Sequence, residues 1–267
     1  METLVASQTK QKNRRSLRRN KPKQFEKKFK LIGVNAAGLA TKLKSLDFVL
    51  KEIDPTIFFI EETKMRTSGK IKTENTGNYQ IFELLRKNSA GGGLAIGAKT
   101  DIEPVWLSEG DDSVEVLVVQ VKVGEIIIRC VGAYGPQEKD PIERKNKFWE
   151  RLSHEVEKAQ ETNAAFILQM DGNLWAGKEI IENDVHDCNQ NGKMFVEFMK
   201  KHSHLVVVNS LDICNGTITR RRKTTRGLEE SVLDFFVVCN KISRFIVKLR
   251  HGRSTPERAH VHMYTLC

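Results

Sequence analysis

The stretch Phe166-Ile-Leu-Gln-Met-Asp171-Gly-Asn173 ends an apolar run on a carboxylate and a carboxamide two residues apart. A second apolar run, Ile-Phe-Phe-Ile, leads in the same way into Glu61-Glu62. Short apolar runs that stop at polar residues are typical of buried strands. We therefore expect the polar side chains at strand ends, where rigid supports can present oxygen atoms to a hard metal ion.

Three further apolar runs end on polar side chains: Asn35 follows Phe-Lys-Leu-Ile-Gly-Val, Tyr134 follows Val-Gly-Ala, and Asp234 lies within Ser231-Val-Leu-Asp-Phe-Phe. Oxygen ligands and neutral hydrogen-bond donors in this combination suit magnesium-assisted attack on a phosphodiester. The five runs together favour a nuclease or a phosphatase.

Short strand patterns alternate with helical patterns along the chain, which indicates an α/β domain. Helices are expected over Leu43–Ile53, Pro141–Ala159 and Gly192–Lys201. The strand patterns between residues 79 and 131 have little helix between them, so an antiparallel meander is expected there. The strands are predicted over the following ranges: 31–34, 57–60, 79–85, 93–96, 114–121, 126–131, 166–170, 205–208, around 218, and 232–238.

The first 30 residues differ in composition from the rest. They hold eleven Lys or Arg against two Glu, so they carry nine of the ten net positive charges of the chain. Almost no apolar residue lies between Val5 and Phe25, and such a segment cannot offset its ordering entropy by burial. We expect residues 1–30 to form a disordered basic tail, for nuclear targeting or nucleic-acid contact, ahead of one domain over 31–267.

Other features narrow the class of protein. No apolar stretch reaches the ~18 residues of a membrane span, and no signal-peptide core is present. The five cysteines are an odd number without a Cys-x-x-Cys pair, which argues against a disulfide framework or a zinc site. These observations predict a chain that is neither secreted nor in a membrane.

In order and spacing, Asn35, Glu62-Thr-Lys, Tyr134-Gly-Pro, Asp171-Gly-Asn and Ser-Val-Leu-Asp234 resemble the motifs of the endonuclease/exonuclease/phosphatase superfamily. The most similar members are the apurinic-type endonuclease domains of LINE-type non-LTR retrotransposons, which share the later Asn189-Gln-Asn191-Gly192 pattern. The resemblance covers roughly residues 31 to 249.

The resemblance implies a DNase I-like, four-layer α/β sandwich: two mixed β-sheets flanked by helices, with one Mg²⁺ or Mn²⁺ where the sheets meet. Glu62 would be the main metal ligand, with Asn35 beside it. Asp171 would be the general base, and Asn173 and Tyr134 would hold the phosphate.

The resemblance also implies that Asp234 orients a histidine. Glu61 stands where the family commonly has Gln; strand alternation places it on the face opposite to Glu62, and we assign it no role.

The C-terminus departs from the family pattern. Family members end on an Asp-His pair in a final strand, whereas no Asp precedes His251, His260 or His262 here. We therefore expect a domain that is truncated or altered after about residue 249, that lacks the last strand and that has impaired activity.

A basic segment lies between two predicted strands. Its cations favour contact with DNA phosphates by a hairpin beside the site, and they are Arg220, Arg221, Arg222, Lys223 and Arg226.

Two main readings of function remain open. The first is a Mg²⁺-dependent endonuclease that nicks DNA in the nucleus, as a monomer, with a reverse transcriptase encoded in the same element. The second is an inactive, nucleic-acid-binding remnant of such a domain. A phosphoinositide or sphingomyelin phosphodiesterase of the same superfamily is disfavoured by the retroelement-like motifs and by the missing membrane or secretion signal.

Overall fold

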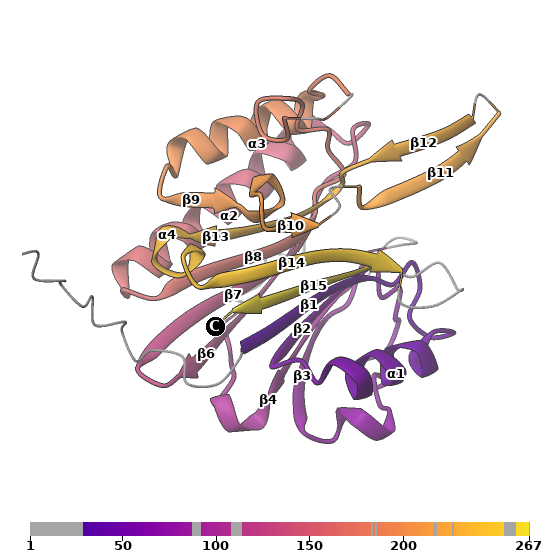
Figure 1. Cartoon of the computed structure of the whole chain (residues 1–267), viewed down its shortest axis with the longest axis vertical. Helices are drawn as coiled ribbons and strands as arrows, with labels where there is room; N and C mark the ends of the chain where they lie inside the picture. Colours follow the sequence, from indigo (N-terminus) through magenta and orange to yellow (C-terminus); the bar gives the residue numbers. More distant parts are fainter. Residues whose placement is uncertain are drawn as a thin grey trace, which may run out of the picture.

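The computed structural model describes residues 29–86, 92–107, 114–182, 184, 186–215, 218–225, 227–253 and 260–266. Nearly all of the predicted basic tail lies outside these ranges. Within them, two β-sheets stack face to face, with helices on their outer sides (Figure 1). The prediction of two mixed sheets flanked by helices is therefore confirmed.

Sheet A has seven strands, and β1 lies near its middle, parallel to β2 and antiparallel to β15. In spatial order its strands are β10 (Cys214–Asn215), β14 (Ile246–Arg253), β15 (His260–Leu266), β1 (Phe29–Asn35), β2 (Ile57–Glu61), β4 (Leu94–Lys99) and β3 (Tyr79–Leu84).

Sheet B has six strands, and its parallel pair β7–β8 is flanked by antiparallel neighbours. In spatial order its strands are β5 (Val105–Trp106), β6 (Glu115–Val123), β7 (Ile126–Tyr134), β8 (Ala165–Asp171), β13 (Asp234–Cys239) and β9 (Leu205–Val207). The separate hairpin of β11 (Arg220–Thr224) and β12 (Gly227–Ser231) projects away from both sheets in Figure 1.

Each sheet is covered by helices with one apolar face. Helix α1 (Leu43–Ile53) packs Leu46, Val49 and Leu50 against sheet A, and α2 (Ile142–Glu161) and α3 (Gln190–Lys201) lie outside sheet B. The remaining helices are short: η1 (Glu74–Thr76), η2 (Thr100–Ile102), η3 (Val208–Ser210) and α4 (Asn240–Ser243). The three predicted helices are confirmed to within two residues at each end. No described helix has the length and the apolar character needed to cross a membrane.

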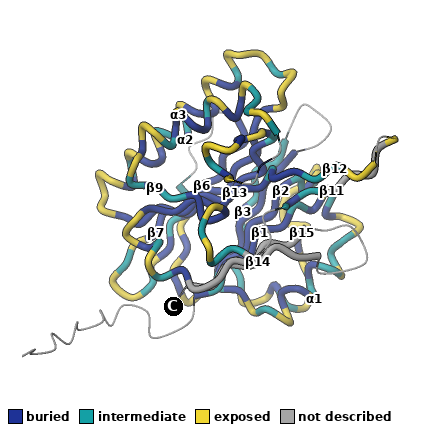
Figure 2. The backbone as a smooth tube through the Cα atoms, turned by 45° about the horizontal axis from the view of Figure 1, so that its top comes forward, coloured by how far each residue is buried: buried dark blue, intermediate teal, exposed yellow. Residues whose placement is uncertain are grey.

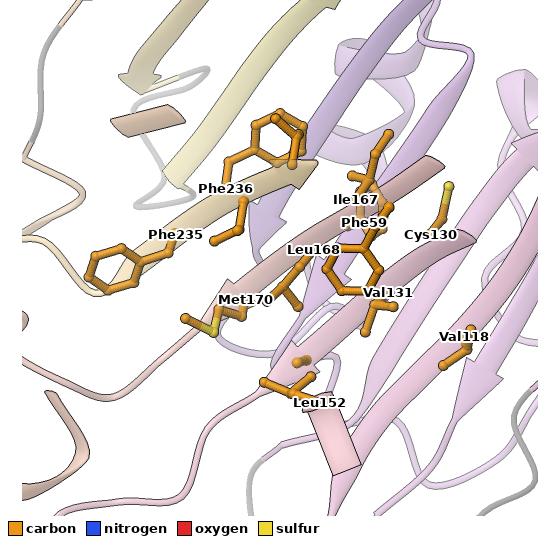
Figure 3. Close-up of a cluster of buried hydrophobic side chains, with 14 of the residues drawn as sticks. Phe59, Val118, Cys130, Val131, Leu152, Ile167, Leu168, Met170, Phe235 and Phe236 are labelled. Carbon is orange, nitrogen blue, oxygen red and sulfur yellow. The ribbon is translucent and has the colours of Figure 1, made fainter. Parts of the chain in front are cut away.

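Apolar side chains fill the space between the sheets. Figure 3 shows Phe59 of β2 among side chains of sheet B, including Val131 of β7 and Leu168 of β8. The tube in Figure 2 is buried along these central strands and exposed mainly in helices and loops. Close to the site the sheets approach tightly, since a Cβ atom added at Gly33 would lie 2.6 Å from the Gln169 carboxamide carbon.

The structure corrects three predictions made from the sequence. The expected meander is divided, because β3–β4 belong to sheet A and β5–β7 to sheet B. The expected loss of the last strand is wrong: β15 pairs antiparallel with β1 along its whole length and with β14 on the other side. The predicted strand at residue 218 is also absent from the described residues, where β11 begins at Arg220.

Candidate active site

The predicted site residues come together at one end of the sandwich. Strands β1, β2, β7 and β8 all run toward this end, and β13 starts there. In sheet B, Asp171 is in register with Tyr134 on one side and with Asp234 on the other. In sheet A, Asn35 is in register with Glu61, the residue before Glu62.

Asn35 connects the two sheets. Its Nδ2 donates to Oδ2 of Asp171 at 2.8 Å and approaches Oε1 of Glu62 at 3.4 Å. Its Oδ1 accepts the backbone N–H of Ala37 at 3.0 Å and, as a carbonyl oxygen, retains a second lone pair. The Asn35 amide therefore lies between Asp171 at the end of β8 in sheet B and Glu62 just after β2 of sheet A.

Glu62 lies just past β2 in a left-handed backbone conformation, with φ of 51°. Its carboxylate forms an ion pair with Lys64 at 2.8 Å. The loop is fixed because Thr63 and Lys64 donate backbone N–H groups to the carbonyl oxygens of Gly93 and Gly92 at 3.0 and 2.9 Å.

Glu115, which the sequence analysis missed, anchors this glycine segment. It is buried at the start of β6, accepts the N–H of Gly93 at 2.6 Å, and pairs with Arg86 at 3.0 Å. Burial raises the pKa of Glu115, while the Gly93 N–H and Arg86 oppose that rise. Glu115 thus supports the loop that carries Glu62. Its only signal in the sequence is an acidic residue at the start of an apolar run.

Asp171 and Asn173 form a tight turn after β8. Oδ1 of Asp171 accepts the Asn173 N–H at 3.1 Å, and Asn173 has φ of 46° and donates its Nδ2 to the Gly135 carbonyl oxygen at 2.9 Å. Burial, followed by the charge of Asp234, holds the pKa of Asp171 well above its usual range, against the lowering effects of the Asn173 N–H and Arg220.

Tyr134 lies at the end of β7, beside this turn. Its side chain is largely buried, and burial together with the charges of Asp171 and Glu62 raises the pKa of its phenol. A hydrogen bond with the Asn173 side chain acts in the opposite direction. The phenol is therefore neutral over the physiological range, so it can donate a hydrogen bond.

Asp234 is held by two residues that the sequence analysis did not identify. Its N–H donates to Oγ1 of Thr219 at 3.1 Å, and its carbonyl oxygen accepts from Nδ2 of Asn209 at 3.1 Å. Asn209 is buried and follows β9, so the signal that identified Asn35, a polar residue after an apolar run, could have found it.

Glu61 lies beneath the site, between the sheets. It is completely buried, and burial followed by the charges of Asp234 and Asp171 raises the pKa of Glu61, whereas the Gln169 side chain lowers it. Alternation along β2 puts Glu61 on the same inter-sheet face as Phe59, which separates it from Glu62 as predicted.

The last strand brings a histidine into the neighbourhood. In the β1–β15 ladder the backbone of His260 is in register with that of Asn35. The sequence predicted no strand here, so only the structure reveals this juxtaposition. Ala259, the residue before His260, lies outside the described residues.

The predicted basic segment forms one strand of the projecting hairpin rather than the whole hairpin. Its partner strand β12 is acidic, since Arg221 is in register with Glu230 and Arg222 with Glu229. The charge of Arg220 reaches Asp171 and lowers its pKa. Arg226 lies outside the described residues.

A divalent cation fits this donor set. Among the described residues, no three His, Cys, Asp or Glu side chains gather closely enough to hold a metal ion by themselves. Mg²⁺ rarely needs such a cage, because one or two carboxylates, water and substrate phosphates complete its shell. Glu62 offers one carboxylate here, and the neighbouring Asn35 offers one amide oxygen.

Comparison with known proteins yields structural relatives only: no family model and no curated protein sequence matches the chain. The endonuclease domain of TRAS1, a telomere-specific non-LTR retrotransposon, superposes with a TM-score of 0.66 at 13% identity, over 89% of this chain and 98% of that one. The AP endonuclease LMAP from Leishmania major gives 0.71 at 16% identity, over 90% and 87%.

A third similar structure is the 3′ phosphatase NExo (D146N) from Neisseria bound to a product DNA hairpin, with a TM-score of 0.67 at 14% identity over 90% and 99% of the two chains. The chain therefore shares the DNase I-like fold of these structures, which confirms the predicted fold.

Proposed function

We propose that this protein is a divalent-metal-dependent phosphodiester hydrolase that nicks DNA, of the type found in retrotransposons. The observation that carries the proposal is the contact of the Asn35 amide with both Asp171 and Glu62 across the two sheets. Two structures of the same fold support it: a retrotransposon endonuclease domain and a 3′ phosphatase bound to a product DNA hairpin.

In the proposed site Glu62 and Asn35 would hold Mg²⁺ or Mn²⁺, and the ion would neutralise charge that develops on the phosphate. Asp171 accepts a proton from the attacking water. Its fixed hydrogen bonds to Asn35 and to the Asn173 N–H keep its carboxylate in one orientation, so the base is positioned before substrate arrives.

Asn173 and Tyr134 are the proposed phosphate-binding donors. Both are neutral, so they can donate hydrogen bonds to phosphate oxygens without competing for the metal ion. The hairpin cations Arg220 to Lys223, together with Arg226, are proposed to contact DNA phosphates beyond the site. On the partner strand β12, two acidic residues are in register with two of these arginines.

We further propose that His260 supplies the imidazole that Asp234 would orient. Support comes from the register of His260 with Asn35. The chain thus differs from the Asp-His pair of the family at one position, where Ala259 stands in place of Asp, and not by the loss of a whole strand. A monomer in the nucleus, acting with a reverse transcriptase of the same element, remains our proposal for the biological setting.

Plasmid nicking with and without EDTA tests the proposal. Glu62→Gln is expected to abolish Mg²⁺-dependent nicking, and His260→Ala to reduce it by about 10³–10⁴, by analogy with removal of a histidine from a catalytic triad. His251→Ala, on the neighbouring strand β14, is the matched control. Ala259→Asp should raise nicking because it recreates the Asp-His pair of the family. Wild-type protein that binds DNA without nicking it would instead favour the inactive remnant.

A further inference from the structure

The loop that follows Asn173 presents one aromatic ring to solvent. Trp175 is 36% exposed, whereas its neighbours Leu174 and Ala176 are completely buried. Those two apolar side chains tie the loop to the core on both sides of the tryptophan. The ring is therefore exposed on a segment that is itself firmly attached.

The backbone of Trp175 is held at both ends of its peptide unit. Its N–H donates to Oδ1 of Asn189 at 3.2 Å, and its carbonyl oxygen accepts the N–H of Asn189 at 3.3 Å. The same Oδ1 caps α3 by accepting the N–H of Gly192 at 2.8 Å. A Cβ atom at Gly192 would collide with the Trp175 carbonyl oxygen, so this close approach requires glycine.

His186 supports the ring from one side. The indole and the imidazole stack with centroids 4.8 Å apart and an angle of 24° between their planes. His186 is in turn fixed by the buried Asp184, whose Oδ1 accepts the His186 N–H at 3.0 Å and lies 3.2 Å from Nδ1. Since one indole face lies against the imidazole, the exposed area belongs to the other face and to the rim.

This ring is close to the proposed phosphate donor. Two residues of extended chain span at most about 7 Å, which limits the distance between the Cα atoms of Asn173 and Trp175. With a rise of roughly 3.4 Å per base, that distance corresponds to about two nucleotides. A fixed and partly exposed aromatic ring at that range matches the platform on which an unpaired nucleobase stacks.

We propose that Trp175, backed by His186, stacks against an unpaired or extruded nucleobase within about two nucleotides of the scissile phosphate. The inference rests on the proposed DNA-nicking function and adds a preference for its substrate. A base inside an intact duplex already stacks on its neighbours, so the platform favours DNA in which a base near the cleaved bond is mismatched, unpaired or easily extruded.

Fluorescence of 2-aminopurine tests the contact without turnover. The probe is an oligonucleotide duplex with an unpaired 2-aminopurine at successive positions beside the nick site, titrated with protein in EDTA. Wild type and Trp175→Phe should quench the probe at one or two positions. Trp175→Ala should lose the quenching and bind this DNA about tenfold to a hundredfold more weakly, as loss of a base stack implies, while binding fully paired DNA about equally well.

Trp106→Ala is the matched control, because Trp106 is 50% exposed on the edge strand β5 and lies outside the site. Circular dichroism should show unchanged folding for all three variants. Quenching that survives in Trp175→Ala, or an equal loss of affinity for paired and unpaired DNA, would overturn the proposal.

The readouts separate the two proposals. Quenching that depends on Trp175 in a protein that never nicks would leave the stacking inference intact and would contradict the proposed enzymatic function. Metal-dependent nicking that is unchanged in Trp175→Ala, on paired DNA and on DNA with an unpaired base, would support the enzymatic function and contradict the stacking inference.

Discussion

Two groups of buried charges occupy sheet B and its surroundings, and they differ in how their charges are compensated. Under α2, Glu155 accepts from Nε of Arg129 at 2.7 Å and pairs with Arg151 at 2.8 Å; we call these three residues the paired cluster. At the end of the sandwich lie Glu61, Asp171 and Asp234, which we call the carboxylate cluster. Burial, followed by the charge of Asp234, raises the pKa values of both Glu61 and Asp171.

The difference indicates that the paired cluster has a structural role and the carboxylate cluster a functional one. Opposite charges in contact offset the desolvation of each partner, so the paired cluster can stabilise the packing of α2 on β7. Like charges that are buried together destabilise the fold, and a protein retains them where they do chemistry. Substitutions in the two clusters should therefore have opposite effects on activity and on stability.

The largest effect is expected in the carboxylate cluster. Asp171→Asn should lower nicking by on the order of 10³–10⁴ or more, since the neutral amide cannot accept the proton from water. Its melting temperature should stay equal to or rise above that of wild type, because one of the mutually repelling carboxylates is removed. Plasmid nicking and thermal melts measure the two outcomes. The exposed Asp101→Asn is the control, and a clear drop in melting temperature for Asp171→Asn would count against the contrast.

The paired cluster should respond in the opposite way. Glu155→Gln leaves Arg129 buried without its counter-charge, so we expect the free energy of unfolding to fall by about 3–5 kcal/mol. Urea denaturation measures it. The nicking rate per folded molecule of Glu155→Gln should equal that of the wild-type protein. Replacing both Arg129 and Glu155 by Met should recover most of the loss; a double variant no more stable than Glu155→Gln would show that the cluster is not a simple ion pair.

Added Mg²⁺ should stabilise the folded protein through Glu62 and not through the paired cluster. At about a hundredfold excess over its dissociation constant, a ligand of the folded state adds roughly 2.7 kcal/mol. Differential scanning fluorimetry with and without EDTA should show this rise in wild type and in Glu155→Gln, but not in Glu62→Gln. An equal rise in Glu62→Gln would place the ion elsewhere.

The smallest effect concerns His202, which packs between α2 and α3. It is buried and lies 3.0 Å from the Ser153 hydroxyl oxygen. Burial, followed by the charges of Lys201 and His204, lowers the pKa of His202, and Glu157 acts against them. The unfolded chain therefore binds a proton at a higher pH than the folded one. The contribution of His202 to the free energy of unfolding should be full above about pH 6.5, the ordinary pKa of histidine. It should decline as the pH falls below that value.

His202→Gln should flatten that decline between pH 7 and 5 in urea melts, whereas the exposed His154→Gln should leave it unchanged. An identical slope in wild type and His202→Gln would contradict the assignment.

The amino-acid sequence by itself determined the local elements and the candidate site. Helix α1 begins and ends as predicted at Leu43 and Ile53, because an amphipathic period is a property of neighbouring residues. Asn35, Glu62 and Asp171 converge as expected, since polar residues that follow buried strands meet at one end of the sheets.

Only the tertiary structure decided which strands pair. The sequence predicted β4 and β6 as strands of one meander, yet they lie in different sheets, because strand pairing depends on contacts between distant segments. Strand β15, His-Val-His-Met-Tyr-Thr-Leu, lacks a long apolar run and was not predicted, but β1 and β14 supply ladder partners on both of its sides. The backbone hydrogen bonds of those neighbours, absent from any local pattern, place His260 in register with Asn35.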